Sequence, residues 1–366
     1  NSQAYHQHTQ NLAPIPHQIV DDGPVLENIL EGGAIDVTKF PSPLWNPEDG
    51  GRYIGTGCFN ITRDPDSGWI NCGTYRVMVH DEKRVGLYIS PGKHGRIHRD
   101  KYMAKGEPMP VCIVIGSDPL SFLTSSTEAP EGMCELDMMG AYRGEAVQCV
   151  TGKHTGLPFP ANSEIVIEGF IHPGNTKEEG PFGEWLGYQG GVMEAEPWVD
   201  ISAIYHRDNP IMLGAAHIRM PYEYARYRAI SRSAVLKENI ARAGVPDVTE
   251  VWAHEVGGSR MLLAVGIKQR YPGHAKQAGH IACQCHAGAY GGKWVIVVDD
   301  DINITDLDEL IWAALTRADP ATSIDFITNA WTSPADPRVH PDERAKGNLT
   351  NSRMIIDACI PFHWRD

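Results

Sequence analysis

The first half of the chain consists of short β-type segments separated by turn clusters. Between residues 51 and 205, runs at 76–79, 85–89, 111–115 and 164–168 hold four or five residues each and favour β-branched side chains. Clusters of Pro, Gly, Asp and Ser lie between these runs. Many short strands at close spacing predict a barrel or a sandwich as the first domain.

The second half alternates helical and strand patterns. Residues 223–243 contain no Gly or Pro and are followed by Gly244, which predicts one long helix with an ordinary C-terminal signal. Strands are predicted at 261–267 and 295–298, and a further helix at 305–317. Strands that alternate with helices predict an α/β layer as the second domain.

The helix predicted at 305–317 carries its own start signal. Its apolar residues fall on one face, at the spacing of a helix that packs against a sheet. Thr305 followed by Asp308 is similar to a capping box, so we expect Thr305 to cap the start of this helix.

These patterns divide the chain into a sequence of expected parts. We expect an α+β protein in which a long helix connects a strand-rich domain to a smaller α/β domain. The parts are a linker or partial N-terminal segment at 1–50, the strand-rich domain at 51–220, the connecting helix at 221–244, the α/β domain at 245–345 and a C-terminal segment at 346–366 that could contact a partner subunit.

Charge and composition exclude several classes of protein. The net charge is −14 without a basic block, so no nucleic-acid partner is expected, because phosphate binding needs clustered Lys and Arg. No apolar run approaches the ~20 residues that cross a bilayer, so no membrane association is expected. The eight scattered cysteines indicate reduced, buried thiols in a cytoplasmic protein.

One cysteine cluster allows a second interpretation. Cys283, Cys285 and His286 could form half of a metal site. The chain has no second ligand pair of matching spacing, which favours buried or helix-packed thiols instead.

The densest chemical signal is the motif Glu179-Gly-Pro-Phe-Gly-Glu184. Its turn lets both carboxylates reach one pocket, where two close carboxylates cannot both ionise easily and one pKa rises. A glutamic acid with a raised pKa can act as a general acid near neutral pH. The alternative is a pair of solvated acids that flank a surface turn, and the spacing alone favours it.

Three further clusters hold candidate site residues. Arg76, five residues after Asn71, has a guanidinium that suits a structural ion pair, a substrate carboxylate or a flavin phosphate. His94 follows a strand and a glycine turn, where it could enter a cleft or make only a local hydrogen bond. Glu135 and Asp137 open a predicted helix, where acids also stabilise the helix by itself.

In order and context, Asn71, Arg76, His94, Glu135 and the paired glutamates resemble the UbiD family of decarboxylases. Family members carry a longer front, so the family's N-terminal domain is expected to be absent or truncated in this chain. The resemblance runs from about Asp21 to Trp364 and includes the segments 161–169, 299–303 and 311–317.

The resemblance implies a split β-barrel that binds prenylated FMN through a metal. Asn71, His94 and Glu135 would hold Mn²⁺ or Mg²⁺, since a mixed set of oxygen and nitrogen ligands suits a hard divalent cation. A potassium ion is expected beside the carbonyls around Ser125 to Thr127, and Lys293 is expected to contact the flavin phosphate. The other implied cofactor contacts are Thr74, Arg76 and Lys93.

The resemblance also implies a catalytic set. Arg76, paired with Glu179, would position the substrate and support the reactive cofactor, and Glu184 would protonate the carbon that loses CO₂. In this family the prenylated flavin bonds covalently to the substrate and acts as the electron sink. His217 would face the substrate, and a buried structural histidine is the equal alternative.

The expected activity is the reversible non-oxidative decarboxylation of an aromatic or heteroaromatic acid, such as a hydroxybenzoate. The polar residues His217 and Lys93 favour a polar substituent on the substrate. The alternatives are a decarboxylase of cinnamic-type unsaturated acids, a split-barrel FMN oxidoreductase and a non-catalytic flavin-binding or assembly subunit. A flavin prenyltransferase is the implied supplier of the cofactor, and a homo-oligomer, dimer or hexamer, is implied as the assembly.

Overall fold

The computed structural model describes residues 12–127, 129–190, 194–216, 218–220, 222–333 and 335–365. Contacts divide the described chain into two compact units. The strand-rich unit comprises residues 12–183 and 194–216, and the C-terminal unit comprises residues 184–190 and the described residues after 217. Glu179 therefore belongs to the strand-rich unit and Glu184 to the C-terminal unit.

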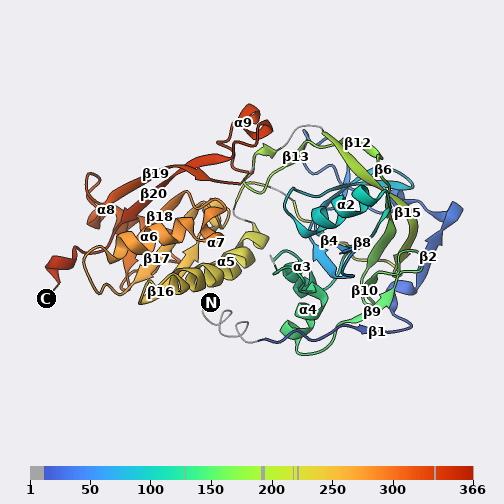
Figure 1. The fold of residues 1–366 in the computed structure, drawn as a ribbon, viewed down its shortest axis with the longest axis horizontal. Coiled ribbons are helices and arrows are strands. Elements are labelled where there is room, and N and C mark those ends of the chain that lie inside the picture. The colour runs from blue at the N-terminus through green and yellow to red at the C-terminus, as the bar shows by residue number, and fades with distance from the viewer. Residues whose placement is uncertain are drawn as a thin grey trace. The chain divides into compact units, whose positions relative to one another are not determined.

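The strand-rich unit is built on a 10-stranded antiparallel sheet (Figure 1). The strands predicted at 76–79, 85–89, 111–115 and 164–168 are confirmed and lie in β6, β7, β8 and β11. In path order the strands are β3 (Tyr53–Gly55), β6 (Arg76–Asp81), β7 (Arg84–Tyr88), β15 (Glu194–His206), β11 (Ile165–Ile171), β8 (Met109–Ile115), β4 (Cys58–Arg63) and β5 (Ile70–Gly73), while β2 (Asn28–Glu31) and β12 (Thr176–Glu179) also pair with β15.

A short connection forces this sheet to roll up. In path order β5 and β6 are six strand steps apart, which would be about 29 Å in a flat sheet. Only Thr74 and Tyr75 lie between them along the chain, so the strand ends are at most about 11 Å apart. Among the described strands β5 and β6 do not pair with each other, so the sheet curls into a barrel that stays split along this seam.

Helices cover parts of this sheet. The described helices of the unit are α2 (His94–Lys105), α3 (Pro119–Ser125) and α4 (Glu135–Arg143). Helix α2 ends at Gly106, whose φ of 70° is the left-handed conformation that glycine adopts readily at a C-cap. Helix α3 begins after Asp118, whose carboxylate accepts a hydrogen bond from the Ser121 N–H.

Alternating strand residues face two separate cores. On β8, Ile113 belongs to a core shared with β6, β7, β11 and β15, whereas Cys112 and Val114 belong to a second core. Leu136 and Met139 of α4 cover this second core. Because side chains alternate between the two faces of a strand, the polar residues of neighbouring strands also lie on defined faces of the sheet.

Residues 12–50 are part of the strand-rich unit and not a linker, so the expectation for 1–50 is wrong over this range. The segment pairs with strands far along the chain, which a local pattern cannot show: β1 with β9, and β2 with β15. Its elements and the small sheet that it joins are β1 (Gln18–Ile19), η1 (Pro24–Leu26), η2 (Gly32–Ala34), η3 (Val37–Lys39), β9 (Gln148–Thr151) and β10 (Pro158–Pro160).

The C-terminal unit is an α/β layer, as expected (Figure 1). Its sheet has the order β16-β17-β18-β20-β19, in which the three central strands are parallel and the two edge strands antiparallel to them. The strands are β16 (Val248–Ala253), β17 (Leu262–Ile267), β18 (Trp294–Asp299), β19 (Ile324–Trp331) and β20 (Thr350–Asp357).

Helices pack on both faces of this sheet. Alternate residues of β18 separate the faces: Val295 and Val297 share a core with α6, while Ile296 and Val298 share one with α8. Among the described residues no helix combines the length and the apolar character that a membrane span requires. The helices are α5 (Glu223–Arg242), η4 (Glu255–Gly257), α6 (His274–Gln284), α7 (His286–Ala289), α8 (Leu307–Arg317), α9 (Pro341–Ala345) and η5 (Phe362–Trp364), and the short strands near the unit boundary are β13 (Phe182–Gly183) and β14 (Gln189–Gly190).

Two expectations for this unit are corrected. Residues 350–357 form β20 inside the sheet, so the chain after 345 is not a separate C-terminal segment. Helix α8 is capped by Asp306, whose carboxylate accepts the N–H groups of Asp308 and Glu309. The Thr305 hydroxyl donates to the Asn303 side chain instead, so it is not available as the predicted cap.

Candidate active site

Arg76 and Glu179 form a close ion pair inside the strand-rich unit. Arg76 opens β6 and Glu179 closes β12. The guanidinium donates through Nε to Oε1 at 2.8 Å and through Nη2 to Oε2 at 2.6 Å, a two-point contact that fixes both side chains. The Glu179 side chain is 1% exposed and that of Arg76 16% exposed, so the pair is largely shielded from water while the arginine keeps some access.

Aromatic residues hold this ion pair in place. The Tyr53 hydroxyl donates to Glu179 Oε1 at 2.8 Å, and burial, with the nearby Glu179 carboxylate, raises the pKa of Tyr53. The Arg76 guanidinium carbon lies 4.3 Å from the ring centre of Tyr88 and 5.4 Å from that of Phe182. These cation–π contacts leave the arginine little rotational freedom.

The Gly-Pro-Phe-Gly turn after Glu179 is anchored to residues 49 and 50. The Gly50 N–H donates to the Pro181 carbonyl at 2.8 Å, and a Cβ at Gly50 would lie 1.9 Å from the Gly180 carbonyl oxygen. Glycine is therefore required at residue 50 by close approach. The Gly183 N–H donates to the Asp49 carboxylate at 3.0 Å, which fixes the far end of the turn.

Glu184 lies in the C-terminal unit, so its position is described within that unit. Its N–H donates to the Tyr188 carbonyl at 2.7 Å, and its own carbonyl accepts from the Gly187 N–H. Burial raises the pKa of Tyr222 to about 12, with the Glu184 carboxylate among the groups that raise it. The alternative interpretation of the motif, a pair of solvated acids, is wrong for Glu179, because this side chain is buried. The Glu184 side chain is half-buried.

Glu135 is a buried carboxylate at the start of α4, with 2% of its surface exposed. Its Oε2 accepts the Cys72 N–H at 2.8 Å, and burial raises the pKa of Glu135 to about 7. No Lys, Arg or His among the described residues forms an ion pair with it. A buried carboxylate without a cationic side chain is costly unless a cation compensates it, so the residue fits a metal ligand.

Asn71 is next in sequence to Cys72, whose N–H binds this carboxylate. Asn71 directly precedes Cys72 on β5, and its Nδ2 lies 3.5 Å from Thr62 Oγ1 and 3.4 Å from the Tyr75 hydroxyl. The amide nitrogen is thereby engaged, and Oδ1 is the atom left to bind a cation.

His94 opens α2 beside the same strand. Its ring lies 4.8 Å from the ring of Trp69, and Trp69 Nε1 donates to the Met133 carbonyl at 3.0 Å, two residues before Glu135. The strand-rich unit thus brings together the segments that carry Asn71, His94 and Glu135. An amide oxygen, an imidazole and a carboxylate are chemically suited to Mn²⁺ or Mg²⁺.

The other predicted cofactor contacts have distinct surroundings. Ser125 ends α3, and its buried hydroxyl has no hydrogen-bond partner among the described residues, which suits a cation ligand. Thr74 lies half-buried between β5 and β6, and Lys93 is the half-buried N-cap of α2. Lys293, in the C-terminal unit, pairs with the fully buried Asp336 at 2.8 Å. His217 lies outside the described residues.

Among the described residues, Cys283, Cys285 and His286 belong to no group of three possible metal ligands. Cys283 is buried and Cys285 half-buried, and burial raises the pKa of Cys283 to about 11, which confirms the interpretation as structural thiols. A group missed from the sequence joins His17, Cys134 and Asp137, with ligand atoms within 4.8 Å of one another. Asp137 Oδ1 already binds the His17 N–H at 2.9 Å and the ring Nδ1 at 2.7 Å, so this carboxylate anchors the chain before β1.

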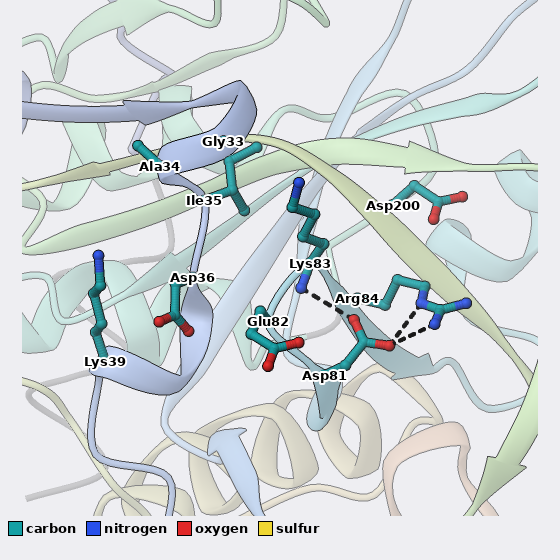
Figure 2. A pocket seen from close by; sticks show the side chains of 10 residues that line it. All are labelled: Gly33, Ala34, Ile35, Asp36, Lys39, Asp81, Glu82, Lys83, Arg84 and Asp200. Atoms are coloured by element: carbon teal, nitrogen blue, oxygen red, sulfur yellow. Dashed lines mark hydrogen bonds and ion pairs between the residues drawn. The ribbon is translucent and has the colours of Figure 1, made fainter.

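An open pocket of about 850 Å³ lies elsewhere on the strand-rich unit (Figure 2). Asp81 lines this pocket and accepts hydrogen bonds from the Lys83 N–H and from the Arg84 guanidinium, two residues that also line it. None of the predicted site residues lines it, and its lining carries charged side chains of both signs. The lining residues are Gly33, Ala34, Ile35, Asp36, Lys39, Asp81, Glu82, Lys83, Arg84 and Asp200.

Sequence reasoning missed the aromatic residues around the site. Tyr53 is 126 residues from its partner Glu179, and no local pattern links the two. Tyr75 lies between Asn71 and Arg76, and Phe182 lies inside the Glu179-Gly-Pro-Phe-Gly-Glu184 motif. Their places in these motifs could have identified both as candidate site residues. Tyr88 ends β7 directly opposite Arg76 on β6, and strands were predicted at both places without their pairing.

Two family models match the chain. The model of the 3-octaprenyl-4-hydroxybenzoate carboxy-lyase Rift-related domain, UbiD, matches residues 18–220. The model of the corresponding C-terminal domain, UbiD_C, matches residues 228–358. A pyrrole-2-carboxylic acid decarboxylase of Pseudomonas aeruginosa is 32% identical over 356 residues, which is 95% of this chain and 71% of that protein.

Solved structures of UbiD-class enzymes are similar over nearly the whole chain. HmfF from Pelotomaculum thermopropionicum in complex with FMN has a TM-score of 0.88 and 31% identity, and the match covers 99% of this chain and 78% of that one. An evolved dimeric form of HmfF in complex with prFMN has a TM-score of 0.84 and 30% identity, covering 100% and 78%. Vanillic acid decarboxylase of Sedimentibacter hydroxybenzoicus has a TM-score of 0.85 and 29% identity, covering 98% and 75%.

The raised pKa of Glu135 generates a prediction for protein freed of metal by a chelator. The folded state binds this proton more tightly than the unfolded chain, so ionisation destabilises the fold. The cost is absent below about pH 4.5 and complete above about pH 7. Glu135→Gln removes this cost, so it should raise the free energy of unfolding relative to wild type at pH 8. The gain at pH 8 should exceed that at pH 4.5 by on the order of 2–3 kcal/mol.

Urea denaturation of both proteins at the two pH values measures this difference. Glu131→Gln is the matched control, because it makes the same chemical change at an exposed residue in the loop before α4. A Glu135→Gln effect that is the same at pH 8 and pH 4.5 would contradict the raised pKa.

Proposed function

The chain belongs to the UbiD family of carboxy-lyases, and on this premise we propose that it decarboxylates an aromatic or heteroaromatic acid with bound prenylated FMN. The observation that carries the proposal is the buried, two-point ion pair of Arg76 with Glu179, flanked by Tyr53 and Tyr88. A structural ion pair alone does not require an arginine that keeps access to solvent beside a stack of aromatic rings.

Arg76 is proposed to bind and orient the substrate carboxylate. Glu179 holds the guanidinium at two points, and its planar fork of N–H donors, part of which stays exposed, has the geometry that a substrate carboxylate binds. Because Glu179 is buried and also bound by Tyr53, it cannot swing away, and the orientation of the arginine is set before substrate arrives.

The residues of the proposed metal site would anchor the cofactor. Asn71, His94 and Glu135 would hold Mn²⁺ or Mg²⁺ against the flavin phosphate, and Thr74 and Lys93 would contact the cofactor. When bound, the prenylated flavin supplies a covalent electron sink for the electrons left as CO₂ departs.

Two further contacts belong to the proposed cofactor site. Ser125, with its buried and unpartnered hydroxyl, would contribute to a potassium site. Lys293 would contribute a positive charge toward the phosphate.

Glu184 is proposed as the proton donor. Its carboxylic acid would deliver a proton to the ring carbon that has lost CO₂ and would regain one from solvent for the next turnover. The reverse reaction uses the same steps in the opposite order, so high CO₂ would favour carboxylation.

The substrate is proposed to carry a polar ring substituent or a ring nitrogen. Relatives with this fold include decarboxylases of pyrrole-2-carboxylic acid and vanillic acid. His217 is the proposed partner of that polar group, a hydrogen bond that would discriminate against plain cinnamic-type acids. We also propose a flavin prenyltransferase as cofactor supplier and a homo-oligomer as the assembly.

An FMN oxidoreductase is the second candidate. The FMN bound to HmfF shows that this fold accepts the unmodified flavin, which favours keeping the candidate. It gives no role to the Arg76–Glu179 pair, because hydride transfer needs no group that orients a departing carboxylate.

Replacing Glu179 by Gln should lower kcat/KM by about 100-fold or more, because an amide cannot hold the guanidinium at two points and orientation is lost. The rate of CO₂ release from pyrrole-2-carboxylate or 4-hydroxybenzoate measures the effect. Glu178→Gln is the matched control, since Glu178 is exposed on the same strand and should keep the wild-type rate. A Glu179→Gln enzyme as fast as the control would refute the proposed role of the pair.

Replacing Glu184 by Gln should leave the flavin content unchanged and reduce turnover at least about 100-fold, because an amide cannot deliver a proton. The absorbance of released flavin measures occupancy, and product formation measures turnover. Glu184→Asp retains an acid and should keep measurable activity. Near-normal turnover of Glu184→Gln would show that another group supplies the proton.

A further inference from the structure

The Tyr75 phenol lies between the two segments that carry Asn71 and His94. Its oxygen is 3.4 Å from Asn71 Nδ2 and accepts the backbone N–H of Gly95 at 3.1 Å. Gly95 directly follows His94 at the start of α2. One buried hydroxyl therefore contacts a strand residue and a helix terminus that belong to the same proposed metal site.

This contact replaces an ordinary helix cap. The N-cap of α2 is Lys93, whose side chain makes no capping hydrogen bond. The first N–H groups of a helix have no intrahelical partner, and the Tyr75 oxygen satisfies that of Gly95 from a different element. The start of α2, and with it the backbone of His94, is thereby tied to the connection between β5 and β6.

The surroundings are shaped around the tyrosine ring. A Cβ at Gly73 would lie 2.2 Å from the Tyr75 oxygen, and one at Gly95 would lie 2.7 Å from a ring carbon. Both glycines are thus needed for the space that the ring fills. Tyr75 is 8% exposed, so its hydroxyl cannot exchange these partners for bulk water.

The same hydroxyl sets the direction of the Asn71 amide. Nδ2 faces Tyr75 and Thr62 Oγ1, which turns Oδ1, the metal-binding atom, to the other side of the amide. Removing the phenol oxygen would free the amide to rotate and would leave the Gly95 N–H buried without an acceptor. Both changes act on proposed ligands without touching any ligand atom.

We propose that Tyr75 is a positioning residue that, together with the Thr62 hydroxyl, orients Asn71 and His94 for a divalent metal and so sets the metal affinity. This rests on the proposed function, in which Asn71, His94 and Glu135 bind that metal. Groups that hold ligands from the second layer commonly change metal affinity by about 10- to 100-fold when removed.

The test is a titration of FMN-loaded protein with Mn²⁺, in which the EPR signal of free Mn²⁺ gives the dissociation constant. Tyr75→Phe keeps the ring and should weaken Mn²⁺ binding by about 10- to 100-fold. Tyr205→Phe is the matched control, because its buried phenol also accepts a backbone N–H, from Lys153, and donates to a carboxylate, Glu168. The control should bind Mn²⁺ like wild type, although both variants lose a buried hydroxyl.

His94→Ala separates this inference from the proposed function. Wild-type Mn²⁺ affinity in His94→Ala would refute the proposed metal site itself. Lost affinity in His94→Ala together with wild-type affinity in Tyr75→Phe would overturn the positioning role alone. If Tyr75→Phe does not fold, Thr62→Val, which removes the other acceptor of the same amide, is titrated instead: weakened binding supports the account and wild-type binding overturns it.

Discussion

The two-residue connection between β5 and β6 is the constraint on which the site depends. It joins strands six steps apart in the sheet, so the sheet must roll up and the end of β5 must lie next to the start of β6. Side chains of β4 hold the connection: Asn60 donates to the carbonyls of Gly73 and Tyr75, and the Cys58 thiol donates to the latter at 3.2 Å. Asn71 and Arg76 are thereby placed on either side of one seam.

This arrangement couples the proposed cofactor site to the proposed substrate site. On one side, Asn71 is held by Tyr75 and Thr62 near the buried Glu135; on the other, Arg76 is held by Glu179. Glu179 is buried and compensated by the partly exposed Arg76, and the buried Glu135 would be compensated by the metal that the proposal places there. Buried charges rarely stabilise a fold, so such a site fixes the geometry of its side chains at a cost in folding free energy.

The sequence predicted where strands lie along the chain better than it predicted which segments pair with one another. Short runs rich in β-branched residues predicted β6, β7, β8 and β11, and the motif around Glu179 indicated a candidate site, because both signals are local. The pairing of residues 12–50 with distant strands, the place of β20 inside the C-terminal sheet and the Tyr53 contact to Glu179 all join segments far apart in the chain. The predicted N-cap of α8 was wrong for a local reason. The Thr305 hydroxyl binds Asn303, and the Asp306 carboxylate accepts the helix N–H groups instead.

The central claim is that the chain uses prenylated FMN to remove CO₂ from an aromatic acid. The most direct measurement is the release of labelled CO₂ from carboxyl-labelled pyrrole-2-carboxylate and 4-hydroxybenzoate, with protein loaded in the dark with prenylated FMN and Mn²⁺ or with FMN and Mn²⁺. The account predicts labelled CO₂ from at least one acid with prenylated FMN and none with FMN. Equal release with both flavins, or NAD(P)H oxidation with FMN and no release with either, would contradict it.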